Sequence, residues 1–197
     1  MTIYITLNEI RNNHPDGRPC KEGWTKLLQG LGKTEADDEP FPITFVMENN
    51  GLDDALWCVE CLRGQDYAVY NLKADIAESV LNIFEQERPD DTRVRDCITA
   101  TRAFAKKELN DAQSAARSAA RAVACGAARD AARAAARAAS MTSESTYAFD
   151  SARAVAWDAA RAAARAAARD DEWDPAWDSA WSSERDKQVR MFRKWFG

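Results

Sequence analysis

Arginine recurs every four residues in the second half of this sequence, in segments that are otherwise mostly alanine. The tract 112–139 carries five arginines on this grid, and the segment 147–169 resumes the same spacing. Alanine has the highest helix propensity of all residues, and Gly126 is the only glycine of the first tract. Two long helices are therefore predicted. The polar residues 140–146 separate them, so the Ala/Arg-rich segment 110–170 is expected to form an antiparallel helical hairpin.

A four-residue step cannot hold arginine on one face of a helix. Each residue turns the helix by about 100°, so each repeat rotates the arginine position by about 40°. Over about five repeats the arginines spread around more than half of the circumference. This spread suits two helices that touch along one or two alanine stripes, where small side chains allow close approach.

Charge is divided unevenly along the chain. Residues 112–169 hold nine arginines against four acidic residues, a net charge of +5, while the whole chain carries −5 and the remainder therefore −10. We divide the chain into an acidic helical domain (1–109), the Ala/Arg-rich hairpin (110–170) and a Trp-rich C-terminal helix (171–197) that packs on the rest. The asymmetry favours either docking of the basic element on the acidic body or an anionic partner.

The acidic domain is predicted to be an array or bundle of short helices. Thr6 and Glu9 have the spacing of a capping box and favour a helix there, although Ile3, Ile5 and Leu7 alternate like a strand. Further helices are expected at Trp24–Leu31, at Ile43–Met47, from an N-cap at Asp53 to Gly64, at Tyr67–Glu87, and around Val94–Ala105, where Arg102 is expected to face water. The fold class is therefore all-α.

The last helix is predicted to begin at Asp174-Pro175, an N-cap followed by a first-turn proline. Four of the seven tryptophans lie in the final 25 residues. Their rings could pack this helix on the rest of the protein or serve as an exposed anchor for a partner.

Arginine and tryptophan share the four-residue grid between Arg153 and Arg185. We predict that a partner protein binds where the two residue types meet, because both dominate interface hot spots. The predicted partner-binding residues are Arg129, Arg133, Arg153, Trp157, Arg161, Arg165, Arg169, Trp173, Trp177 and Trp181. The alternatives are that the arginines solvate alanine helices or bind nucleic acid directly, and a protein partner is favoured over nucleic acid. The alanine stripes also suit a homodimer.

No recognised catalytic motif occurs in the sequence. A single histidine, His14, argues against histidine-dependent nucleophilic catalysis. Cys58 and Cys61 have CxxC spacing, but a zinc site needs two more ligands and His14 is expected far away in a polar loop. Five scattered cysteines are an odd number and are interpreted as free thiols. We expect a protein that is not an enzyme and holds no metal or cofactor.

Charged residues interrupt every alanine run, so no apolar stretch of about 18 residues is present to span a membrane. The segment 1–15 lacks the basic leader and apolar core of a signal peptide. A cytoplasmic location and no membrane partner are therefore expected.

Several segments of the chain are similar to known proteins. The segments Ile3–Pro15, Gly23–Thr34, Asn50–Cys58 and Val80–Arg95, with Ala100–Phe104 after the last, resemble a group of phage and prophage proteins that have Ala/Arg-rich C-termini. Many of that group are labelled immunity proteins, and the resemblance covers nearly the whole chain. It implies an all-helical fold, a phage accessory gene acting in the host cytoplasm, and no catalytic residues. We therefore expect an interaction protein that neutralises a bacterial defence effector or toxin.

Overall fold

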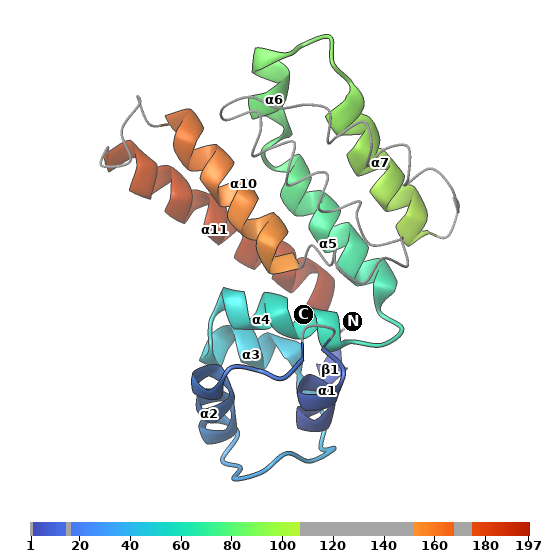
Figure 1. The fold of residues 1–197 in the computed structure, drawn as a ribbon, viewed down its shortest axis with the longest axis vertical. Helices are drawn as coiled ribbons and strands as arrows, with labels where there is room; N and C mark the ends of the chain where they lie inside the picture. The colour runs from blue at the N-terminus through green and yellow to red at the C-terminus, as the bar shows by residue number, and fades with distance from the viewer. Residues whose placement is uncertain (1, 15–16, 107–151, 168–174) are drawn as a thin grey trace.

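The computed structural model describes residues 2–14, 17–106, 152–167 and 175–197 (Figure 1). These residues are mostly helical, with one small sheet, so the all-α prediction is confirmed. The N-terminal elements are β1 (Tyr4–Ile5), α1 (Leu7–Asn12), α2 (Lys21–Gly30), β2 (Phe41–Pro42), α3 (Ile43–Asn49), α4 (Leu52–Cys58) and the 3₁₀ turn η1 (Val59–Cys61). The others are α5 (Asp66–Glu78), α6 (Leu81–Glu87), α7 (Arg93–Ala105), α10 (Ala152–Ala167) and α11 (Pro175–Phe196).

The first residues form both elements that their sequence indicates, a short strand followed by a helix. Tyr4 and Ile5 pair antiparallel with Pro42 and Phe41 in a sheet of two short strands. The capping box then starts α1, because Thr6 Oγ1 accepts the Glu9 N–H at 3.1 Å and Glu9 Oε2 accepts the Thr6 N–H at 2.8 Å. The alternation of apolar residues and the cap therefore describe adjacent elements.

Two helix predictions are corrected. The expected N-cap Asp53 lies inside the first turn of α4, and Gly51 takes the cap position with φ +108°, a conformation that L side chains rarely adopt. The single helix expected at Tyr67–Glu87 is broken at Ser79-Val80 into α5 and α6. Ser79 Oγ donates to the carbonyl of Ile76 at 2.7 Å, a local bond that competes with the helical ladder.

Helix α5 occupies the centre of the molecule. Figure 1 shows it between α7 on one side and the antiparallel pair α10–α11 on the other, and it packs against all three. Its buried residues point in every direction around the helix: Ala68, Val69, Tyr70, Asn71, Leu72, Lys73, Ala74, Ile76 and Ala77. A helix enclosed in this way must compensate any charge that it carries.

Lys73 is the charged residue that α5 buries. Its ammonium lies 2.9 Å from Glu60 Oε1 of η1, and the two side chains are 0% and 5% exposed. The ion pair joins the N-terminal helices to the centre of the fold. Neither charge can regain water without opening the structure.

Asp75, two residues further along α5, connects three helices. Arg102 Nη2 of α7 donates to Asp75 Oδ1 at 2.7 Å, and Lys194 Nζ and Trp195 Nε1 of α11 donate to Oδ2 at 2.7 and 2.9 Å. The prediction that Arg102 faces water is therefore wrong. Its guanidinium also reaches Glu78 at 2.6 Å, so α7 is attached to α5 by two carboxylates.

Alanine forms the inner side of α10. Its fully buried residues are Val155, Ala156, Ala159, Ala160, Ala162 and Ala164, and this side packs against α11 and α5. Small side chains allow this close approach. α10 belongs to the second arm of the predicted hairpin, whereas the first arm lies outside the described residues. α11 begins at Pro175, as its sequence predicts, and the carbonyl of Phe196 accepts the Ile3 N–H at 3.2 Å.

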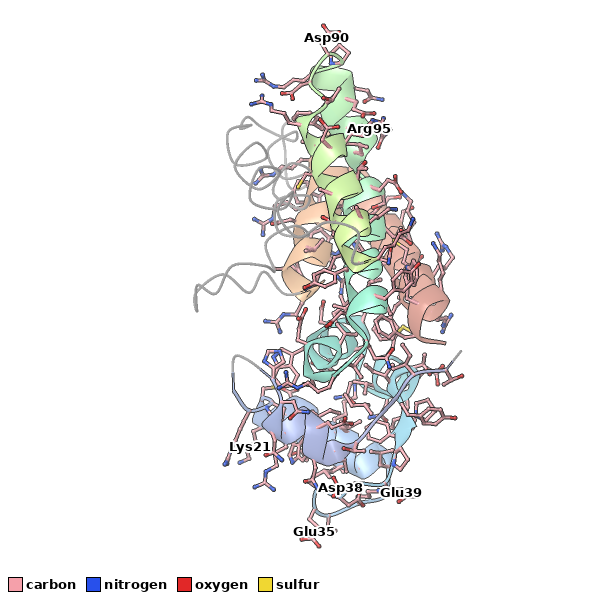
Figure 2. The ribbon with its side chains drawn as sticks, turned by 90° about the vertical axis from the view of Figure 1, so that its right-hand side faces the viewer. Lys21, Glu35, Asp38, Glu39, Asp90 and Arg95 are labelled. Atoms are coloured by element: carbon pink, nitrogen blue, oxygen red, sulfur yellow. The ribbon has the colours of Figure 1, made fainter. Side chains whose placement is uncertain are left out.

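The acidic loop after α2 lies at one end of the molecule. Figure 2 shows Glu35, Asp38 and Glu39 at the opposite end from Asp90 and Arg95. Within this loop Lys33 Nζ binds Asp37 at 2.6 Å and Glu39 at 2.8 Å. The hydrogen bond from Lys33 holds the pKa of Asp37 below its usual value. The loop is thus partly neutralised by its own lysine.

We expect Lys73→Met to lower the free energy of unfolding by about 3–5 kcal/mol, because it leaves the Glu60 carboxylate buried without its ammonium. The double variant Lys73→Met/Glu60→Gln removes both charges and should recover part of that loss. Urea denaturation followed by circular dichroism measures both changes. The exposed Lys26→Met is the matched control and should cost less than about 0.5 kcal/mol. Equal stability of Lys73→Met and the control would contradict the role given to the pair.

Candidate partner-binding surface

Six of the ten predicted partner-binding residues lie in the described part of the chain. Arg153, Trp157, Arg161 and Arg165 are on α10, and Trp177 and Trp181 are on α11. The other four, Arg129, Arg133, Arg169 and Trp173, lie outside the described residues.

The outer side of α10 carries the grid residues. Arg153, Arg161 and Arg165 are exposed, and Trp157 is 42% exposed. The drift of about 40° per repeat spreads these four residues over about 120° of the helix surface, opposite the buried Val155 and Ala159. We call Arg153, Trp157, Arg161 and Arg165 the basic face of α10. It is the one place where the structure brings predicted site residues together on an exposed helix surface in the described ranges.

The Trp157 side chain contacts a carboxylate of α4 and an aromatic ring of α11. Its indole Nε1–H donates to Asp53 Oδ1 of α4 at 3.0 Å. The ring lies edge-to-face on Trp181 of α11, with centroids 5.1 Å apart and planes at 71°. Trp157 therefore both packs on the protein and presents part of its ring to solvent.

Asp53 receives a second donor from α11. Arg185 Nη2 donates to the same oxygen, Asp53 Oδ1, at 2.5 Å, and Arg185 Nη1 donates to Gln188 Oε1 at 3.1 Å. The buried Gln188 in turn donates through Nε2 to the carbonyl of Ala156 at 2.8 Å. We call Asp53, Trp157, Arg185 and Gln188 the Asp53 network. It fixes the backbone of α10 to both α4 and α11.

Sequence reasoning missed most of this network. Arg185 continues the four-residue grid, so its spacing was a signal that it shares the environment of Trp157 and Trp181. Asp53 was interpreted as a helix cap, and nothing in the pattern around it indicates partners more than a hundred residues away. Gln188 carries no sequence signal because a glutamine on a long helix is usually exposed.

A small pocket opens beside Arg153, where α10 meets the N-terminal helices. Its volume is about 70 Å³. Its lining comes from α1 to α4, the segment before α2, and α10: Ile10, Pro19, Cys20, Gly23, Trp24, Leu27, Val46, Asn50, Asp54, Trp57, Cys58 and Arg153. We call it the Trp24 pocket. Its walls are mainly apolar, with Asn50, Asp54 and Arg153 as the polar side chains.

His14 lies in the loop after α1, as predicted, but its ring is buried against α4 and is not far from Cys58. His14 is 5% exposed and its ring stacks on Trp57, with centroids 3.7 Å apart and planes at 6°. The stacking excludes water from the contacting face of each ring. Trp57 thereby packs against His14 while it also lines the Trp24 pocket.

The buried cysteines are thiols with raised pKa values. Burial raises the pKa of Cys61 and of Cys97 to about 12, and it raises that of Cys58 well above its usual range. Cys20 is exposed. Across the described ranges, no three His, Cys, Asp or Glu side chains are grouped as metal ligands would be. Among the described helices, none combines the length and apolar character that a membrane crossing requires.

We expect Asp53→Ala to loosen α10 from α4. It removes the acceptor of both the Trp157 indole and the Arg185 guanidinium, and because the Asp53 side chain is half-exposed the loss of stability should be about 1 kcal/mol. The indole N–H resonance of Trp157 in a ¹H–¹⁵N spectrum should shift upfield. Asp186→Ala, on an exposed position of α11, is the control and should leave that resonance in place. An unchanged Trp157 resonance in Asp53→Ala would refute the bond.

Alkylation of the native protein should modify the exposed cysteine and leave the buried cysteines unmodified. At about pH 8 a thiol with a pKa near 12 is ionised in only about one molecule in ten thousand, so Cys61 and Cys97 should react with iodoacetamide only after unfolding. The exposed Cys20 should be modified in the native protein. Mass spectrometry of proteolytic peptides assigns each site. Rapid native modification of Cys61 or Cys97 would contradict their burial.

No family model, curated protein or solved structure matches this chain. The functional interpretation therefore depends on the basic face of α10, the Asp53 network and the Trp24 pocket.

Proposed function

We propose that this chain is a non-enzymatic phage or prophage accessory protein that binds and inhibits a bacterial defence effector or toxin through the basic face of α10. One observation carries the proposal. Three exposed arginines and a half-exposed tryptophan stand together on a helix whose backbone is fixed by the Asp53 network. A second support is the sequence resemblance to phage proteins.

Preorganisation suits this surface to binding. Association costs free energy for each side chain and segment that must be ordered at the interface. Trp157 is already oriented by Asp53 and Trp181, and α10 is already docked, so part of that cost is met when the protein folds. Arg and Trp are also the residue types that most often contribute binding hot spots.

The charges of two arginines of the basic face are available to a partner. In the described part of the chain, no ion pair or side-chain hydrogen bond reaches Arg153 or Arg161. The acidic loop after α2 lies at the end of the molecule and binds Lys33 instead. A target with an acidic surface would gain complementary contacts and faster association, and the bulk of the helical body would block that surface sterically.

The test is affinity purification of the tagged full-length protein from a bacterial host, with phage plating as the functional readout. The wild type should recover one defence or toxin protein in stoichiometric amount and should restore plating of a restricted phage. The variant Arg153→Glu/Arg161→Glu/Arg165→Glu should lose both effects, with binding weakened at least about a hundredfold because three interfacial charges are reversed.

The control reverses three exposed arginines elsewhere, Arg11→Glu/Arg88→Glu/Arg193→Glu, which changes the net charge equally. It should behave as the wild type. If no specific protein is recovered and phage plating is unchanged, the proposal fails. Recovery of nucleic acid that is released by moderate salt would support direct nucleic-acid binding in its place.

A further inference from the structure

The Trp24 pocket lies directly beside the basic face, because Arg153 belongs to both. The pocket has a volume of about 70 Å³ and mainly apolar walls formed by residues such as Ile10, Leu27 and Val46.

The volume limits what can enter. An apolar cavity of about 150 Å³ in a protein accommodates one benzene molecule. The Trp24 pocket has about half of that space. It fits the end of one aliphatic side chain, such as leucine or methionine, more closely than an aromatic ring or a nucleobase. This size favours a protein side chain of the aliphatic class as the occupant.

The walls are held in place before any ligand arrives. Asn50 Nδ2 donates to the carbonyl of Gly23 at 2.8 Å and to Asp54 Oδ2 at 2.7 Å, which joins α2 to α4 across the pocket. Gly23 allows this approach, since a Cβ at that position would lie 2.7 Å from Asp54 Oδ2 and 3.2 Å from Cys20 Sγ. The hydrogen bond from Asn50 also orients and partly compensates the Asp54 carboxylate, the one acidic group of the lining.

Besides the acidic Asp54, the pocket lining contains one basic side chain. Arg153 is exposed, and within the described ranges its guanidinium has no carboxylate partner. A guanidinium binds a carboxylate through two parallel hydrogen bonds, a geometry that selects Asp or Glu. An aliphatic side chain in the pocket and a carboxylate on Arg153 would therefore come from neighbouring positions of one bound segment.

We propose that the Trp24 pocket is the anchor site for a leucine-sized aliphatic side chain of the target protein, and that Arg153 binds an acidic residue within about one helical turn of it. The inference rests on the proposed function and names the chemistry of the segment that is recognised. It extends the binding surface from α10 onto α2 and α4, where sequence reasoning placed no site residue.

The experiment selects binders from a random 12-residue peptide library displayed on phage, with the immobilised full-length protein as bait. The selected peptides should share Leu, Ile or Met with Asp or Glu up to four residues away. A synthetic peptide of that consensus is then titrated by fluorescence anisotropy. Replacement of its aliphatic residue by alanine should weaken binding at least tenfold.

Three variants of the protein test the assignment. Cys20→Phe places a ring at the pocket mouth and should weaken binding of the peptide at least tenfold, while Gln29→Phe, exposed on α2 but outside the lining, should not. Arg153→Glu should weaken it tenfold, and a peptide whose acidic residue is changed to lysine should regain binding. Circular dichroism shows whether each variant folds, and if Cys20→Phe does not, the Arg153→Glu exchange decides.

A consensus of aromatic or basic residues, no consensus at all, or peptide binding that is indifferent to both Cys20→Phe and Arg153→Glu would overturn the proposal. The selection uses no defence protein and no infection. Its result is therefore independent of the purification and plating experiments, so failure of this inference and failure of the proposed function can be distinguished.

Discussion

The ammonium of Lys73 has to be neutralised at a point that water does not reach, and the Glu60 carboxylate meets that requirement at 2.9 Å. An uncompensated charge there would cost several kcal/mol. The pair is what permits α5 to be covered on every side, and the covering helices α7, α10 and α11 all take their positions from α5. The surface of α10 that faces solvent is thus determined by a charge pair in the centre of the fold.

Local sequence signals predicted local structure well. The capping box of Thr6 and Glu9, the proline at the start of α11 and the alanine content of α10 each act within a few residues. The errors concern polar side chains whose partners are distant in sequence. Asp53 binds groups 104 and 132 residues away, and Arg102 binds Asp75 across 27 residues. Propensity and capping rules contain no information about such partners, so Asp53 looked like a cap and Arg102 like a solvated charge.

At the candidate site, too, the sequence predicted local features but not contacts between distant segments. The four-residue grid predicted that Arg153, Arg161 and Arg165 would lie on a helix surface, because rotation per residue is a property of the helix alone. It could not indicate that Trp157 would be tied to α4 or that Arg185, on the same grid, would point inward to Gln188. The Trp24 pocket draws on five separate segments, and a cavity of this kind exists only once those segments are packed.

The alanine side of α10 has an evolutionary consequence. Ala156, Ala159, Ala160, Ala162 and Ala164 have no exposed surface, so any larger side chain there would push the helix off its support. Substitutions at the exposed positions 153 and 161 leave that seam intact. These two exposed positions can therefore change one residue at a time, while the position of α10 depends on the smallest side chain that a helix favours.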